Sequence, residues 1–223
     1  MKVSILIPIY NREKYLRRCL NSVVNQTHKD IDILIWNDGS TDDSEKIIKS
    51  YDDDRIKLLN SPHKGVAHAR NRLLENCETE YAVWVDSDDE IHHRLIERQI
   101  AFNDGGITRC SYMKADGYPV QLNGEIKRVV PKECPIWTLF FRVEDAPKFH
   151  EPATFAGSDI VWRDLMFRNL GLTEFPKCSN EALYFYYMKH EDRIGRQKRL
   201  QKNRKKHQET LTEIQQFRRM MGI

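Results

Sequence analysis

An apolar run that ends in carboxylates gives the first indication of the architecture of this chain: Tyr81-Ala82-Val83-Trp84-Val85-Asp86-Ser87-Asp88-Asp89. Its first five residues are apolar and rich in branched and aromatic side chains, which is typical of a buried strand. Three similar runs precede it, at residues 3–9, 31–36 and 56–59, and polar or turn-forming residues bound each of them. The first hundred residues therefore predict four strands. Shorter strand-like runs, broken by turn-forming residues, follow at residues 107–113, 118–122, 126–130 and 136–142.

Helical patterns lie between these runs. Apolar residues recur on one helical face over residues 15–23, and further helical segments are expected from Thr41 or Asp42 through Ile48 and over residues 67–76. Regular alternation of strands and helices predicts a mostly parallel, Rossmann-like sheet with helices on both faces. The fold class is thus α/β.

Ligands of such sheets bind beyond the carboxyl ends of the strands. Pro8 and Tyr10 close the first strand, Asp38 follows the second, and the acidic cluster follows the fourth. These polar and aromatic side chains are therefore expected to meet at one edge. Each also has an ordinary explanation, because Asp38 suits a turn and Tyr10 suits the edge of a core.

The acidic cluster Asp86-Ser87-Asp88-Asp89 allows two interpretations. Carboxylates gathered after an apolar strand repel one another, and a divalent Mg²⁺ or Mn²⁺ would relieve that repulsion. Alternatively, Asp88 and Asp89 could stand at the N-terminus of a following helix, expected over residues 91–102, and interact with its dipole. Arg70 is a candidate for binding a diphosphate, although a solvated helix face would explain it nearly as well.

The motifs of the first hundred residues resemble those of family 2 glycosyltransferases of the GT-A fold. The resemblance rests on four segments in the same order and spacing: residues 4–11, Asn37-Asp38-Gly39-Ser40-Thr41-Asp42, Gly65 with Ala69-Arg70-Asn71, and the acidic cluster. Weaker similarity extends to about residue 195. The resemblance implies an inverting transferase that uses a nucleotide-sugar donor, usually a uridine diphosphate (UDP) sugar, with manganese or magnesium.

The resemblance also implies a role for each matching residue of the donor site. Pro8 and Tyr10 would line the base pocket, and Asp38 would bind the uracil. Arg70 would lie near the pyrophosphate. Asp86, in the DxD motif with Ser87, would hold the ribose or a metal-bound water, and Asp88 would be a direct metal ligand.

Two further residues follow from the resemblance in the second half of the chain. Asp159 occupies the place of the family's catalytic base and would deprotonate the acceptor hydroxyl. Its ordinary explanation is a helix N-cap, because a helix is expected over residues 159–169. His190, in Tyr186-Tyr187-Met188-Lys189-His190, would complete the metal site, whereas a histidine in a basic region is commonly just solvated.

The sequence departs from the family pattern in places. Asn37 replaces an acid before Asp38, Ser158 stands where many relatives have an acid, and Arg193 replaces a small hydroxyl residue. The Gln-x-x-Arg-Trp motif of the processive synthases does not occur. Transfer of a single sugar is therefore expected.

Charge is distributed unevenly along the chain. Residues 189–223 contain 11 Lys and Arg against 4 Asp and Glu, whereas the whole chain contains 36 against 33. We therefore expect a GT-A domain over residues 1–192 and a basic helical extension over residues 193–223. Residues 1–100 would bind the nucleotide sugar, and residues 101–192 would bind the acceptor and carry the catalytic base.

The basic extension leaves the acceptor and partners open. Residues 193–206 could bind nucleic acid or the anionic membrane surface that carries a lipid-linked acceptor, and a glycan acceptor is also compatible. An apolar stripe in the same helix could dock on the domain or form a homodimer. The alternative functions are a non-catalytic nucleotide- or sugar-binding module of the same fold, a transferase that acts on DNA, and a nucleic-acid-binding protein.

Composition bears on the compartment. Apolar residues are 40% and charged residues 31% of the 223, which excludes a largely disordered chain. The five cysteines are scattered and form no CxxC pair, which favours a reducing compartment. Neither a signal peptide nor a membrane-spanning run is recognisable. A cytoplasmic protein is expected, with peripheral membrane attachment allowed by the basic extension.

Overall fold

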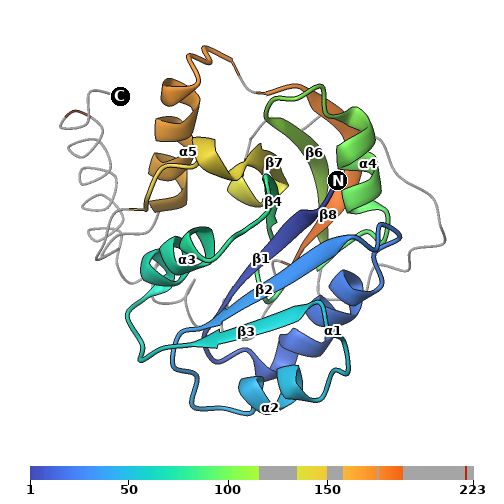
Figure 1. The fold of residues 1–223 in the computed structure, drawn as a ribbon, viewed down its shortest axis with the longest axis vertical. Helices are drawn as coiled ribbons and strands as arrows, with labels where there is room; N and C mark the ends of the chain where they lie inside the picture. Colours follow the sequence, from blue (N-terminus) through green and yellow to red (C-terminus); the bar gives the residue numbers. More distant parts are fainter. Residues whose placement is uncertain (116–134, 150–157, 175, 188–218, 220–223) are drawn as a thin grey trace.

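A computed structural model of the chain describes residues 1–115, 135–149, 158–174, 176–187 and 219. It is an α/β structure in which helices flank one sheet (Figure 1). The strands are β1 (Val3–Ile9), β2 (Ile31–Asn37), β3 (Ile56–Asn60), β4 (Tyr81–Trp84), β5 (Glu90–Ile91), β6 (Thr108–Ala115), β7 (Leu139–Arg142) and β8 (Cys178–Tyr187). The helices are α1 (Glu13–Val24), α2 (Ser44–Lys49), α3 (Val66–Glu75), α4 (Leu95–Phe102) and α5 (Ser158–Asn169), with short 3₁₀ helices at Ile136–Thr138 and Val143–Asp145.

The sheet has eight strands in the order β3-β2-β1-β4-β7-β6-β8-β5. The first four in this order are parallel, as the alternation of strands and helices predicts. Beyond β4 the sheet becomes mixed, because β7 is antiparallel to both β4 and β6, whereas β6 and β8 are parallel. Strand β7 thereby joins the first hundred residues to the second half of the chain.

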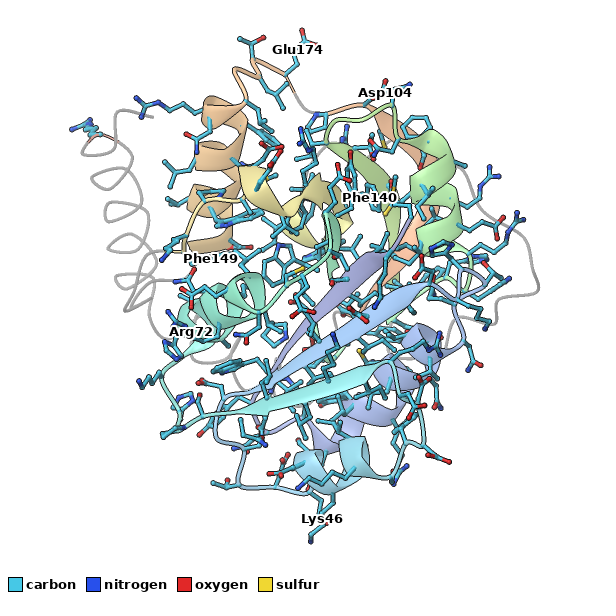
Figure 2. The ribbon with its side chains drawn as sticks, in the orientation of Figure 1. Lys46, Arg72, Asp104, Phe140, Phe149 and Glu174 are labelled. Atoms are coloured by element: carbon cyan, nitrogen blue, oxygen red, sulfur yellow. The ribbon has the colours of Figure 1, made fainter. Side chains whose placement is uncertain are left out.

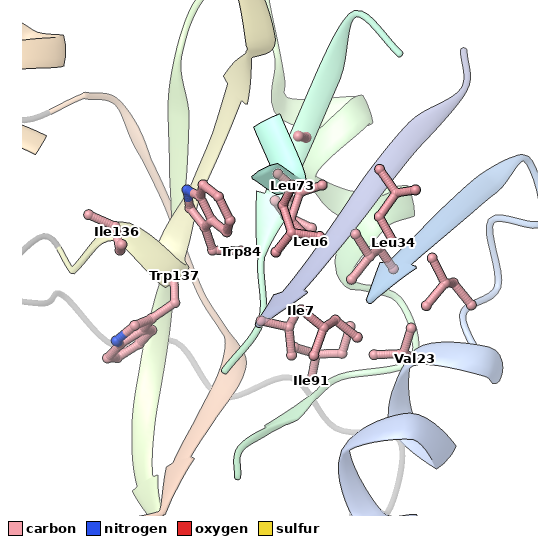
Figure 3. Packing of buried hydrophobic residues seen from close by; sticks show 14 of the residues in the cluster. Leu6, Ile7, Val23, Leu34, Leu73, Trp84, Ile91, Ile136 and Trp137 are labelled. Carbon is pink, nitrogen blue, oxygen red and sulfur yellow. The ribbon is translucent and has the colours of Figure 1, made fainter. Parts of the chain in front are cut away.

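The core explains why the first strands form where the sequence predicts them. Every residue of β2 is buried, as expected for a strand covered on both faces. Figure 3 shows alternate residues of β1 on opposite sides, with Leu6 beside Leu73 of α3 and Ile7 near Ile91 and Val23 of α1. Helices α3 and α1 therefore cover the two faces of the parallel strands.

The boundaries differ from expectation mainly after residue 89. The expected helix over residues 91–102 begins only at Leu95, because Glu90 and Ile91 pair with β8 as a short strand. The expected strand over residues 136–142 starts with a 3₁₀ turn and becomes β7 at Leu139. Helix α5 confirms the expected helix over residues 159–169.

Several predictions lie outside the described residues. The strands expected over residues 118–122 and 126–130, the basic helix and His190 are among them. Among the described helices, none combines the length and apolar character needed to cross a membrane.

Candidate functional site

The acidic loop after β4 holds its three aspartates in different environments. Asp89 is fully buried, and its carboxylate accepts hydrogen bonds from the Tyr184 hydroxyl at 3.1 Å and the Tyr187 backbone N–H at 2.9 Å. Asp86 and Asp88 are only partly buried. Asp89 thus joins the loop to β8, whereas Asp86 and Asp88 remain accessible.

This geometry corrects the helix-dipole interpretation of Asp88 and Asp89. Helix α4 starts at Leu95, more than one turn beyond both aspartates, and the dipole effect falls off within the first turn. The loop is held instead by contacts with distant segments. Tyr184 accepts a hydrogen bond from the Asp86 backbone N–H at 3.0 Å, and Arg18 of α1 donates to the Asp88 carbonyl at 2.7 Å.

Arg70 of α3 forms an ion pair with this acidic loop. Its side chain is only 9% exposed, and its Nη2 lies 3.2 Å from Oδ1 of Asp86. The guanidinium also lies over the rings of Trp84 and Phe149, at 5.9 and 5.4 Å from their centroids. A solvated helix face is therefore wrong for Arg70, because α3 turns this side chain into the interior.

Asp159 lies in the same electrostatic environment as Asp86. Burial raises the pKa of Asp86, Arg70 opposes that rise, and the charges of Asp88 and Asp159 increase it further. Asp159 is partly buried and belongs to the first turn of α5, which begins one residue earlier at Ser158. The fold therefore brings together acids that are more than 70 residues apart in the sequence.

The second polar cluster lies at the ends of β1 and β2. Oδ1 of Asp38 accepts a hydrogen bond from the Lys64 N–H at 2.9 Å, and its Oδ2 accepts one from the Gly65 N–H at 2.8 Å. His63 Nδ1 lies 2.8 Å from Oδ2 of the same carboxylate. Asp38, which is 2% exposed, therefore fixes the segment that leads into α3.

Tyr10 is exposed rather than packed at a core edge. It is 39% exposed, and its ring stacks on that of His63 with centroids 3.9 Å apart and planes 20° apart. The core-edge explanation for Tyr10 is therefore wrong. Pro8, partly buried near the end of β1, pairs in register with Trp36, and Ser87 is buried at 4% exposure.

The residues present suit a hard divalent cation. Asp86 and Asp88 offer carboxylate oxygens, the donors that Mg²⁺ and Mn²⁺ prefer. Burial, and then the charges of Asp88 and Asp159, raise the pKa of Asp86, and a nearby cation would favour its ionised form. Within the described ranges, no group of three histidine, cysteine or acidic side chains is arranged to hold a metal. The third ligand inferred from the resemblance, His190, lies outside those ranges.

Other residues of the site carry no signal in the sequence pattern. His63 lies in an unremarkable turn, and Arg18 is one of many charged residues on α1. Asn71 does belong to a quoted motif, and its side chain hydrogen-bonds to both the N–H and the carbonyl of Phe149. These contacts depend on segments that approach one another only in the folded chain.

Comparisons with known proteins identify the family of the chain and agree with its fold. The family model for glycosyl transferase family 2 matches residues 4–137, and the chain belongs to this family. Glycosyltransferase GlyA of Streptococcus pneumoniae is 43% identical over 98 residues, which are 43% of this chain and 14% of GlyA. Glycosyltransferase GlyG of the same organism is 34% identical over 120 residues, 51% of this chain and 40% of GlyG.

Solved structures support the fold. TarS of S. aureus, residues 1–349, superposes with a TM-score of 0.67 at 22% identity, over 84% of this chain and 60% of that one. TarS was also solved with UDP-GlcNAc, where 85% of this chain and 59% of that chain are covered. The GT-A type of fold is thus confirmed. The chain spans less than half the length of GlyA and GlyG.

Proposed function

We propose that this chain transfers one sugar from a nucleotide-sugar donor, most simply a UDP sugar, to an acceptor hydroxyl with inversion at the anomeric carbon. The reaction depends on Mn²⁺ or Mg²⁺. Membership of glycosyl transferase family 2 supports the class of reaction. A non-catalytic nucleotide- or sugar-binding module would be favoured by a misplaced Asp159 or an incomplete metal site, whereas the charge of Asp159 acts on Asp86. A nucleic-acid-binding protein would give the acids at the end of β4 no chemical task.

One observation carries the proposal: Arg70, Asp86 and Asp159 converge from α3, the loop after β4, and α5. The ion pair of 3.2 Å joins Arg70 to Asp86, and the charge of Asp159 acts on the same carboxylate. A site with both carboxylates and a buried guanidinium can bind a diphosphate and accept a proton nearby.

The donor would lie along the carboxyl edge of β1, β2 and β4. The exposed Tyr10 ring offers a stacking surface to a base. Pro8 would line the same base pocket, and Asp38 would bind the uracil. Ser87 and Asp86 would face the ribose, and Arg70 the pyrophosphate. TarS, a protein of the same fold, was solved in complex with UDP-GlcNAc, which supports a UDP sugar as the donor to test first.

The chemistry requires one proton transfer and one displacement. Asp159 accepts the proton of the acceptor hydroxyl as its oxygen attacks the anomeric carbon. The bond from that carbon to the diphosphate oxygen breaks on the opposite face, so the configuration inverts and the nucleoside diphosphate leaves with the bonding electrons. Arg70 stabilises the negative charge of the leaving group.

Asp88 and Asp86, together with His190, would hold the divalent cation. When bound, this cation neutralises charge on the diphosphate. Asp86 then serves both as a partner of Arg70 and as a neighbour of the cation.

The first experiment measures melting temperature with UDP, GDP, CDP and dTDP, each with Mn²⁺ or with EDTA. A ligand at 100 times its dissociation constant adds about 2.7 kcal/mol to the free energy of unfolding. We expect UDP to raise the melting temperature only when Mn²⁺ is present. Asp88→Asn should abolish that increase, because it removes a charged metal ligand.

The control is Asp104→Asn, which removes an acid whose side chain is 70% exposed and distant in sequence from the motifs. It should retain the full response to UDP and Mn²⁺. If none of the four nucleotides raises the melting temperature of the wild-type protein, with or without Mn²⁺, the proposed function is contradicted.

The acceptor and the partners stay predictions. Residues 193–206 lie outside the described part of the chain, so binding to nucleic acid, to an anionic membrane or to a second copy rests on their charge and pattern alone. The division into a domain over residues 1–192 and an extension over residues 193–223 has the same basis. Cytoplasmic localisation is likewise inferred from composition.

A further inference from the structure

Asn71 forms a paired contact with a segment far along the chain. Its Nδ2 donates to the carbonyl oxygen of Phe149 at 2.9 Å, and its Oδ1 accepts from the Phe149 N–H at 2.7 Å. Both partners are nearly inaccessible, with Asn71 4% and Phe149 3% exposed. One amide side chain thus satisfies both polar groups of a buried residue, whose groups would otherwise lose hydrogen bonding.

The same segment is held from its other side by α5. The Phe149 ring stacks on Trp162, with centroids 5.1 Å apart and planes 7° apart. Trp162 is 1% exposed, and its indole N–H donates to the carbonyl oxygen of Pro147. Figure 2 shows Phe149 between α5 and α3, the helix that carries Arg72. We call residues 147–149 the strap.

The strap connects the two parts of the candidate site. Asn71 directly follows Arg70, which pairs with Asp86. Trp162 lies three residues after Asp159 on α5, so these two side chains lie on neighbouring parts of one helical face. Neighbouring residues of α3 therefore contact both parts of the site. Arg70 pairs with Asp86, and Asn71 binds the strap that packs against α5.

We propose that Asn71 is a positioning residue that sets the place of Asp159 relative to Arg70 and Asp86 by holding the strap against α3. This inference rests on the proposed function. Asn71 touches no reacting atom in this scheme. Its contribution is geometric, since a displacement of about 1 Å between reacting groups can reduce a rate on the order of 100-fold.

The first test requires no substrate and uses Asn71→Ala in the full chain. Hydrogen exchange followed by mass spectrometry reports the opening of local structure. We expect faster exchange over residues 147–149 and 158–162 in the variant, with α3 itself still protected. The matched control is Asn76→Ala, because Asn76 is exposed and its side chain donates to the Arg72 carbonyl of its own helix, at 2.8 Å.

The second test separates binding from turnover. The probes are UDP with Mn²⁺ for affinity, and UDP release from UDP-GlcNAc and other UDP sugars for rate. Asn71→Ala should lower kcat roughly 10- to 100-fold while changing the affinity for UDP by less than about two-fold. A residue needed only for stability would alter the melting temperature without this split between kcat and affinity.

If Asn71→Ala folds poorly, Trp162→Phe tests the same role of the strap from the side of α5. It retains a ring on Phe149 and removes the hydrogen bond to Pro147, so it should show the same split. Because both substitutions loosen one strap, the double variant should lose less than the product of the two single effects.

The outcomes distinguish failure of the positioning role of Asn71 from failure of the proposed function. If the wild-type chain neither binds UDP nor releases it from any donor, the proposed function fails, and this inference fails with it. If the wild-type chain is active but Asn71→Ala keeps its kcat, or exchange over residues 158–162 is unchanged, only the positioning role is contradicted.

Discussion

The surroundings of Asp86 shift the pKa of its carboxyl group in opposite directions. Burial and the charges of Asp88 and Asp159 raise its pKa, whereas Arg70 at 3.2 Å lowers it. Acids that repel one another in this way cost folding free energy and are typical of functional sites. Binding of a cation and a diphosphate would offset this cost, because both bring charges that these side chains can pair with.

Asp159→Asn should separate catalysis from binding at this site. We expect kcat for UDP release to fall roughly 100- to 10,000-fold, because the amide cannot accept the acceptor proton. The melting temperature should stay equal or rise, since the substitution removes a charge that repels Asp86. Kinetics and calorimetry with UDP and Mn²⁺ measure the two effects.

The conservative control for that experiment is Asp164→Asn, also on α5 but paired with Arg163 at 2.7 Å. It should retain its kcat. An active Asp159→Asn enzyme would remove Asp159 from the mechanism and leave the catalytic base unassigned.

At the scale of elements, the turn between β2 and α2 is built against the segment before α3. Gly39 has a φ of +72°, and an added Cβ would lie 2.7 Å from the His63 backbone nitrogen. Asp38 binds the same segment through Lys64 and Gly65. The connection between β2 and α2 therefore requires an acid followed directly by a glycine, and Asp38 and Gly39 provide this pair.

Gly39→Ala should destabilise the protein by about 3 kcal/mol, because left-handed backbone strain adds to a collision with backbone atoms. It should also weaken UDP binding, since His63 and Asp38 would shift. Chemical denaturation at pH 7 measures the first effect and calorimetry the second.

Gly106→Ala is the matched control, because its added Cβ meets nothing within 4 Å and its φ is not in the left-handed range. It should be nearly neutral. Equal stability of the Gly39 and Gly106 variants would mean that the turn relaxes without cost.

At the scale of the whole molecule, Asp32 ties together the first three parallel strands. Its carboxylate is 7% exposed and accepts from Lys2 at 2.7 Å and Lys57 at 3.3 Å. Burial acts to raise the pKa of Asp32, but the hydrogen bonds and charges of Lys2 and Lys57 prevail and lower it below its usual value of 3.8.

This shift predicts the direction of a pH effect on global stability. A carboxyl whose pKa is lower in the folded state stabilises the protein above its unfolded pKa, and loses that contribution as pH falls through the folded value. Asp32→Asn should therefore cost about 1 kcal/mol at pH 7 and progressively less below about pH 4.

Urea denaturation of both proteins between pH 7 and pH 3 measures this difference, with the exposed Asp104→Asn as control. A constant difference between wild type and Asp32→Asn at all pH values would show that the ion pairs do not account for the effect.

The amino-acid pattern alone predicts the parallel part of the fold and places polar residues after the ends of its strands. The apolar runs of β1, β2 and β4 are continuous enough to predict strands, because strands buried on both faces are mostly apolar. The run of the edge strand β3 is shorter, and none of its residues is fully buried. The resemblance then placed the chain in its family, which the match over residues 4–137 confirms. Roles for single residues, including His190, stay predictions.

The contacts of each polar residue, in contrast, become visible only in the folded molecule. Asp89 belongs to the core and Tyr10 to the surface, which local sequence does not reveal, because both depend on the distant partners Tyr184 and His63. The pairing of β7 with β4, and the contact of Asn71 with Phe149 in the strap, join segments more than 50 residues apart. Such contacts form when the whole chain packs, so their pattern is not local in the sequence.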